Sequence, residues 1–222
     1  MIRWLGLLLL VAAGFAAFPG IDLAVSGYFF DGSTFPVQQN RLIEQVRLLL
    51  YGAENLGAAA SLLAALWAGW RSRAVFGMWA RDWAYGFAVF ALGPGVLVNG
   101  VLKPLWGRAR PDHITAFGGT AEFTPFWQIS DQCTHNCSFT SGEASGSAAL
   151  AILLGLLITA NRTRLGPFYR PGLALTACIP LFTLWQRVAA GRHFLSDVVF
   201  GVLLVVLLAV ALQPLRHGTR MA

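Results

Sequence analysis

The sequence predicts an all-α protein, a bundle of six transmembrane helices with its functional site at the outer interface. Hydrophobic residues make up 56% of the 222 residues and charged residues only 12%, whereas a soluble domain has about 25% charged residues. A helix needs about 20 mostly apolar residues to cross the hydrocarbon core. Stretches near this length are residues 4–24, 53–70, 83–102, 144–160, 172–190 and 196–213. We expect residues 1–222 to form a single membrane domain.

The first stretch allows two interpretations. Arg3, followed by an apolar run and small residues up to Ala17, resembles a secretory signal peptide. The apolar run continues past Pro19 to Leu23, which is long for a signal peptide and favours a retained transmembrane helix. Both interpretations place the following segment outside the cytoplasm.

The segment before the second stretch is amphipathic. Between Val37 and Leu50, the charged residues Arg41, Glu44 and Arg47 alternate with apolar ones. This pattern is typical of a helix that lies in the membrane interface. It fits equally well an early start of the second transmembrane helix.

Basic residues in the loops predict the orientation. With the N-terminus inside, nine arginines fall on the cytoplasmic side and seven basic residues on the outer side. Most of the outer basic residues lie in the motifs described below, where a functional site can require them. Without these residues, the excess of basic residues on the cytoplasmic side follows the positive-inside rule. The outer face would then be the periplasmic side of a bacterial inner membrane. Because the bases lie in short loops between apolar runs, we expect membrane lipids as partners and no nucleic acid.

Three short polar segments fall on this outer face. Lys103–Pro111 follows the third apolar stretch, Ser138–Glu143 opens the fourth, and Arg187–Asp197 joins the fifth and sixth. We expect the three segments to meet in one pocket where these helices reach the outer interface.

Three cations in these segments, Lys103, Arg110 and Arg187, predict a phosphate site. Ionisable groups near the membrane interior are costly unless they have partners. A bound phosphate is such a partner, since guanidinium groups bind its oxygens in a bidentate fork.

Ser141, Gly142 and Glu143 stand where the fourth helix should begin. The free N–H groups of a helix N-terminus bind anions, and glycine lets an oxygen approach the backbone closely. The alternative is an ordinary N-cap, with a hydroxyl at the cap and a glutamate in the first turn.

His193 and Asp197 are separated by one helical turn, which would place both side chains on one helix face. A carboxylate in that position can hold one imidazole nitrogen, leaving the other as a nucleophile or base. The alternative is a structural pair that caps the last helix.

Together, Lys–x6–Arg–Pro, Ser–Gly at a helix start and Arg–x5–His–x3–Asp, in this order, resemble the type 2 phosphatidic acid phosphatase (PAP2) superfamily, in its membrane lipid phosphatase branch. The motifs span residues 103–197, and the six-helix plan extends the likeness over nearly the whole chain. Membrane members that act on lipid A are similar in size and layout.

The resemblance implies a role for each matching residue. His193 would attack phosphorus to form a phosphohistidine that water then hydrolyses, and Asp197 would orient it. It implies no metal and no other cofactor. The residues that would bind the phosphoryl oxygens are Lys103, Arg110, Ser141, the Gly142 backbone and Arg187.

Glu143 departs from the family pattern, which has a histidine after Ser–Gly that protonates the leaving oxygen. A carboxyl can replace it only if it stays protonated; burial favours that form and nearby cations oppose it. His113 and His135, in the neighbouring loop, are alternative donors. Because a good leaving group needs little acid assistance, Glu143 favours a sugar 1-phosphate or a lipid diphosphate such as undecaprenyl diphosphate as substrate. The alternative is a bulky glycolipid such as lipid A.

Two other functions fit the same motifs. A lipid phosphotransferase would pass the phosphoryl group from the same phosphohistidine to a second lipid instead of water. A non-catalytic relative would use the site to bind or transport lipids. The sequence carries no indication of oligomeric state.

Cys133 and Cys137 lie four residues apart in a polar outer loop. They could be two free thiols, or zinc ligands if His135 and another residue joined them. We predict a disulfide between them, because this loop would face an oxidising compartment. Cys178 lies in an apolar stretch, where we expect it to be buried.

Overall fold

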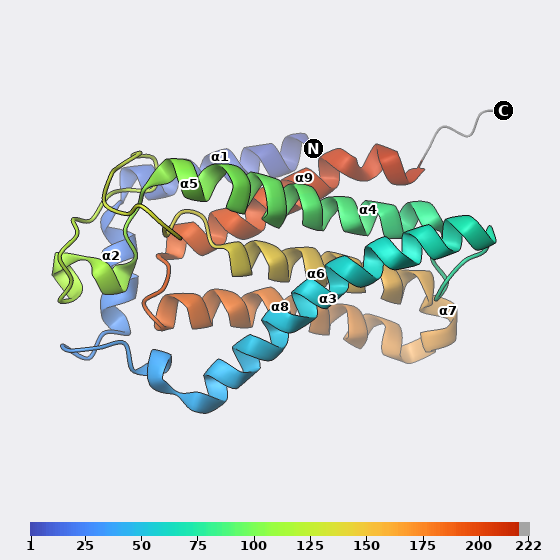
Figure 1. Cartoon of the computed structure of the whole chain (residues 1–222), viewed down its shortest axis with the longest axis horizontal. Helices are drawn as coiled ribbons and strands as arrows, with labels where there is room; N and C mark the ends of the chain where they lie inside the picture. The colour runs from blue at the N-terminus through green and yellow to red at the C-terminus, as the bar shows by residue number, and fades with distance from the viewer. Residues whose placement is uncertain (218–222) are drawn as a thin grey trace.

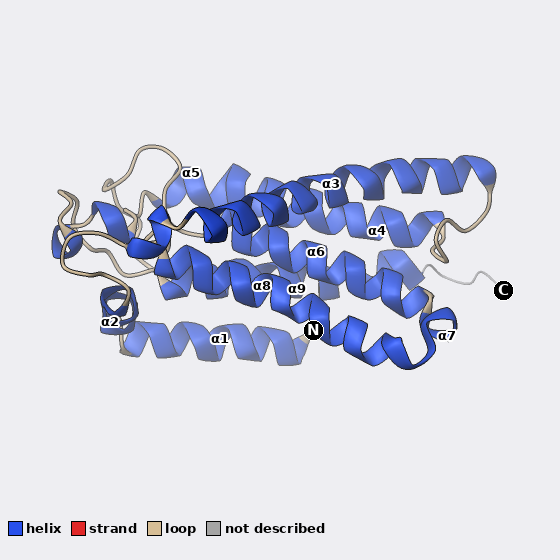
Figure 2. Cartoon of the chain, turned by 90° about the horizontal axis from the view of Figure 1, so that it is seen from below, coloured by secondary structure: helices blue, strands red, loops and turns tan. Residues whose placement is uncertain are grey.

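The computed structural model describes residues 1–217, and within this range it is helical, without β-strands (Figure 2). The longer elements are α1 (Ile2–Ala17), α2 (Gly20–Tyr28), α3 (Arg41–Arg71), α4 (Ala80–Phe90), a π-helical continuation η2 (Ala91–Leu102), α6 (Gly142–Ala160), α8 (Tyr169–Ala189) and α9 (Leu195–His217). Short helical turns are η1 (Pro36–Gln39), α5 (Lys103–Trp106), η3 (Pro111–His113), η4 (Thr115–Phe117), α7 (Arg162–Leu165) and η5 (Gly166–Phe168).

The predicted all-α membrane bundle is confirmed. Among the described residues, five helices are long and apolar enough to cross a membrane, or up to six if α1 and α2 count as one bent span. The long helices run along the same general direction, with α3 crossing the bundle obliquely (Figure 1). The connecting loops around α2 and α5 gather at one end, which we call the α2 end.

The expectation of one continuous helix over residues 4–24 is wrong. The chain bends by 83° between α1 and α2, so that α2 turns across the α2 end (Figure 1). The break falls at Phe18, whose φ of −130° is not helical, directly before Pro19. Proline disfavours a helical conformation in the residue before it, which explains where the helix stops.

The amphipathic segment is the start of a transmembrane helix, and the interfacial-helix interpretation is wrong. α3 runs unbroken for 31 residues from Arg41, so it is about 46 Å long and exceeds the hydrocarbon thickness. Asn40 caps it by accepting hydrogen bonds from the N–H groups of Leu42 and Ile43, both at 3.1 Å. The helix is therefore longer than one crossing of the membrane core requires.

α6 forms the centre of the bundle and contacts α3, α4, η2, α8 and α9. Its buried face consists mainly of small residues, from Ala144 to Ala149, which let the neighbouring helices approach closely. Leu150 and Leu153 extend this face into the main apolar core. Cys178 was expected to be buried but lies exposed on α8.

Candidate active site

A cavity of about 770 Å³ opens at the α2 end of the bundle. Its walls come from α3, η2, α6, α8 and the turn between α8 and α9. The predicted site residues that line it are Lys103, Arg110, Gly142, Glu143, Arg187 and His193. The structure thus brings together residues from all three sequence motifs.

His193 lies in the turn between α8 and α9, with 3% of its surface exposed. Gly191 shapes this turn with a φ of +64°, and a Cβ there would overlap the ring of Phe35. The His193 Nδ1 lies 2.8 Å from the backbone oxygen of Ser138. Because a carbonyl only accepts hydrogen bonds, Nδ1 carries the proton and Nε2 keeps a lone pair.

Burial, followed by the positive charges of Arg187, Lys103 and Arg110, holds the pKa of His193 well below its ordinary value of 6.5. The imidazole is therefore neutral at pH 7, as a nucleophile must be. The unfolded chain would bind this proton at a higher pH than the folded one, so this group lowers stability as pH falls below about 6.5.

We expect diethyl pyrocarbonate, which acylates only neutral imidazole, to inactivate the detergent-solubilised protein with an apparent pKa below 6.5. The measurement is the inactivation rate against pH, with inorganic phosphate as the protecting ligand. If the inactivation that phosphate prevents had its midpoint at pH 6.5 or above, burial and the cations would not lower the pKa of His193.

Asp197 acts on His193 through its neighbours rather than by the direct contact that was predicted. Its Oδ2 lies 3.9 Å from His193 Nδ1, too far for a hydrogen bond. The same oxygen accepts from the Ser138 hydroxyl at 2.5 Å and from the Phe194 N–H at 2.8 Å. Asp197 thus fixes Ser138, whose carbonyl accepts from His193, and Phe194, which follows His193 in the chain.

A buried ion network behind the cavity was not foreseen from the sequence. Arg108, with no exposed surface, donates from Nη1 to Asp197 at 2.5 Å and from Nη2 to Asp22 at 2.8 Å. Asp22 also accepts from the N–H and hydroxyl of Ser196, at 2.9 and 2.6 Å. The sequence carried one signal of this network. Asp22 is an acidic residue within an apolar stretch, and an ionisable group there needs a partner.

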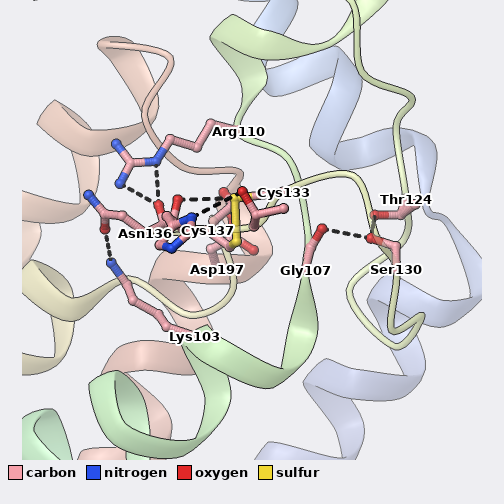
Figure 3. The surroundings of a disulfide bond; sticks show 12 residues. Lys103, Gly107, Arg110, Thr124, Ser130, Cys133, Asn136, Cys137 and Asp197 are labelled. Carbon is pink, nitrogen blue, oxygen red and sulfur yellow. Dashed lines mark hydrogen bonds between the residues drawn. A yellow bond between two sulfur atoms is a disulfide. The ribbon is translucent and has the colours of Figure 1, made fainter.

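The three predicted cations lie around the cavity with donors to spare. Lys103 Nζ is 2.9 Å from the Asn136 side-chain oxygen, and Arg110 donates to the Asn136 backbone oxygen at 2.8 and 3.1 Å (Figure 3). Buried Arg187 Nε has no hydrogen-bond partner. Such an unsatisfied buried donor is uncommon.

The loop that carries Asn136 is closed by a disulfide between Cys133 and Cys137, whose Cα atoms are 5.6 Å apart (Figure 3). The predicted pairing is therefore present in the structure. It constrains the residue on which Lys103 and Arg110 converge.

Glu143 is ion-paired. It accepts from Arg47 Nη1 at 3.0 and 3.1 Å and lies 3.4 Å from Arg187 Nη1. A carboxylate held by two guanidinium groups is an acceptor, which opposes its predicted role as proton donor. Arg47 was not predicted as a site residue. The alternative donors His113 and His135 do not line the cavity.

Ser141 caps α6, and its contact with phosphate stays a prediction. Its side chain is fully buried outside the cavity lining, and its Oγ accepts from the Ala144 N–H at 3.3 Å. Gly142 does line the cavity, and a Cβ there would lie 2.9 Å from Asn99 Oδ1. The free backbone of the α6 N-terminus is therefore the part of this motif that faces a ligand.

Residues 81–219 match the family model of the PAP2 superfamily. The chain belongs to this superfamily. It is 31% identical over 220 residues to a lipid A 4'-phosphatase of Rhizobium etli, covering 93% of this chain and 83% of the relative. A lipid A 4'-phosphatase of Rhizobium leguminosarum is 30% identical, with 93% and 91% covered. This PAP2 protein is thus a membrane lipid phosphatase.

Shorter matches extend the comparison. A lipid A 4'-phosphatase of Francisella tularensis subsp. novicida is 40% identical over 114 residues, covering 49% of this chain and 46% of the relative. A lipid A 1-phosphatase of Rhizobium etli is 33% identical over 135 residues, covering 60% and 48%. No solved structure has a significant match.

Proposed function

We propose that this PAP2 phosphatase removes the 4'-phosphate of lipid A at the periplasmic face of a bacterial inner membrane, through a phosphohistidine at His193. The observation that carries the chemistry is a neutral imidazole with a free Nε2 in a cavity that three cations share. The choice of lipid A is supported by two 4'-phosphatases that align with 93% of the chain. The 1-phosphatase match covers only 60%.

In the proposed reaction, His193 Nε2 attacks phosphorus, the bond from phosphorus to the lipid oxygen breaks, and that oxygen takes up a proton from a solvent water. Lys103, Arg110 and Arg187 neutralise charge on the three phosphoryl oxygens as the bond breaks. A water then attacks the phosphohistidine, releasing inorganic phosphate and restoring the neutral imidazole.

The periplasmic orientation rests on two features of the α2 end. The Cys133–Cys137 disulfide lies there, and structural disulfides persist in oxidising compartments such as the periplasm. Most basic residues of the cavity also lie at this end. The positive-inside rule predicts few basic residues on an outer face, and phosphate binding explains why they are present there.

The test is phosphate release by the purified protein from lipid A, undecaprenyl diphosphate and phosphatidic acid, with the lipid product mapped by mass spectrometry. We expect inorganic phosphate from lipid A, with the loss at the 4' position and the highest kcat/KM of the panel. Faster turnover of phosphatidic acid would contradict the substrate. Transfer to a second lipid without release of phosphate would identify a phosphotransferase instead.

A further inference from the structure

The cavity continues along α3 beyond Lys103, Arg110 and Arg187, and a buried carboxyl, that of Glu54, lines this part of it. Only 6% of Glu54 is exposed, and the residue lies within the membrane-spanning helix α3. Among residues 1–217, Glu54 has no hydrogen-bond or ion-pair partner, and its side chain lines the cavity. A carboxyl at this depth is costly unless it has a partner, and its place in the cavity lining makes it available to a ligand group.

α6 leaves room for this carboxyl. A Cβ at Gly146 would overlap Glu54 Oε2, so glycine lets the carboxyl lie directly against the α6 backbone. Gly146 is four residues, or about 6 Å, further along α6 than Gly142 at the helix N-terminus. Glu54 is therefore placed to contact a group attached to the phosphate rather than the phosphate itself.

Among the residues that the structure describes, none near Glu54 is a free cation. Arg47, two turns earlier on the same face of α3, is already paired with Glu44 and Glu143. Asn55 shares the α3 wall, and its amide nitrogen donates to the Tyr51 carbonyl at 2.8 Å. The Asn55 side-chain oxygen is thus left as an acceptor.

The cavity lining also includes apolar residues of α4 and η2, among them Phe87, Phe90 and Pro94. The cavity thus has a cationic end for phosphate and a second end that combines a carboxyl, an amide and apolar surface. Such a mixture fits an uncharged polar ring that bears acyl chains, whereas a second phosphate would meet a carboxyl there.

We propose that Glu54 forms a subsite that hydrogen-bonds the hydroxyl or amide groups of the sugar that carries the phosphate. This inference rests on the proposed function and extends it, since it explains how the site would distinguish a phosphorylated glycolipid from a simple phospholipid. A site that hydrogen-bonds a substrate group discriminates against analogues that lack it.

The test compares Glu54→Leu and Glu54→Gln with the wild-type protein in detergent. We expect Glu54→Leu to lower kcat/KM for lipid A by about 10- to 100-fold, the usual effect of one lost buried hydrogen bond. Glu54→Gln should stay within about fivefold, because an amide still donates and accepts. The inhibition constant of inorganic phosphate, which needs only the cationic end, should change less than about twofold in both.

Two further variants sharpen the test. Gly146→Ala should displace the Glu54 carboxyl without removing it, and so lower kcat/KM for lipid A in the same direction by a smaller factor. Leu56→Ala, at a 69% exposed position on the same helix, is the matched control and should leave kcat/KM unchanged.

Three outcomes would overturn the subsite. The first is unchanged lipid A turnover in Glu54→Leu. The second is a loss of phosphate inhibition in Glu54→Leu as large as the loss of lipid A turnover, which would make Glu54 structural. Equal losses in Glu54→Gln and Glu54→Leu would identify a cationic ligand group instead. By contrast, wild-type protein that is inactive on lipid A but active on another lipid of the panel would refute the proposed function itself.

Discussion

His193→Asn is expected to lower kcat on lipid A by about 10⁴-fold or more, because it removes the nucleophile of a covalent mechanism. Asparagine keeps a donor near the Ser138 carbonyl, to which Nδ1 now donates at 2.8 Å, so the turn should keep its shape. This substitution leaves the cationic end of the cavity unchanged. The inhibition constant of phosphate cannot be measured on an inactive variant. Binding of inorganic phosphate should therefore be followed by calorimetry, where we expect it to persist.

His135→Asn is the matched control for this substitution. His135 is exposed and does not line the cavity, so its kcat should stay within about twofold of wild type. If His193→Asn kept more than about 1% of the wild-type kcat, a phosphohistidine at this position would be contradicted.

Arg108→Leu is expected to have the second largest effect. It would leave the carboxylates of Asp22 and Asp197 buried without their cation, which costs about 3–5 kcal/mol of stability. It would also release Asp197, which accepts hydrogen bonds from the Ser138 hydroxyl and the Phe194 N–H. The Ser138 carbonyl accepts from His193, and Phe194 follows His193 in the chain, so the imidazole would lose its position. We expect a lower Tm and a loss of kcat of at least about 10²-fold.

Asp22→Asn separates positioning from stability. The amide oxygen can still accept from Arg108 Nη2 and from the Ser196 hydroxyl, which share Asp22 Oδ2, so the protein should fold, but the charge that holds the guanidinium is lost. A fall in kcat with an unchanged inhibition constant for phosphate would indicate a displaced imidazole. Equal losses in both quantities, or none in kcat, would contradict a positioning role for this network.

The sequence foretold the cavity residues well because the motif spacings place them at helix ends on one side of the bundle. Lys103 directly follows η2, Gly142 begins α6 and Arg187 lies in the last turn of α8, so helical geometry alone brings them to one interface. The contact between His193 and Asp197 was misjudged for a local reason. α9 begins at Leu195, so His193 precedes the helix and the rule for residues one turn apart does not apply.

The partners of these residues could not be read from the sequence, because they are far apart along the chain. Arg108 and Asp22 are separated by 86 residues, and Arg47 and Glu143 by 96. Glu54 was hidden in the same way, since its burial depends on a glycine of another helix. Pairings of this kind follow from the packing of α2, α3 and α6 and not from any local pattern.

Trapping the covalent intermediate is the most direct test of His193 as the nucleophile. Wild-type protein would be mixed with lipid A labelled with ³²P at the 4'-phosphate, quenched within one turnover and digested under alkaline conditions, which preserve phosphohistidine. We predict acid-labile label on the peptide that contains His193, and none in His193→Asn. Turnover by the wild type without label on this peptide, or label on another residue, would contradict the account.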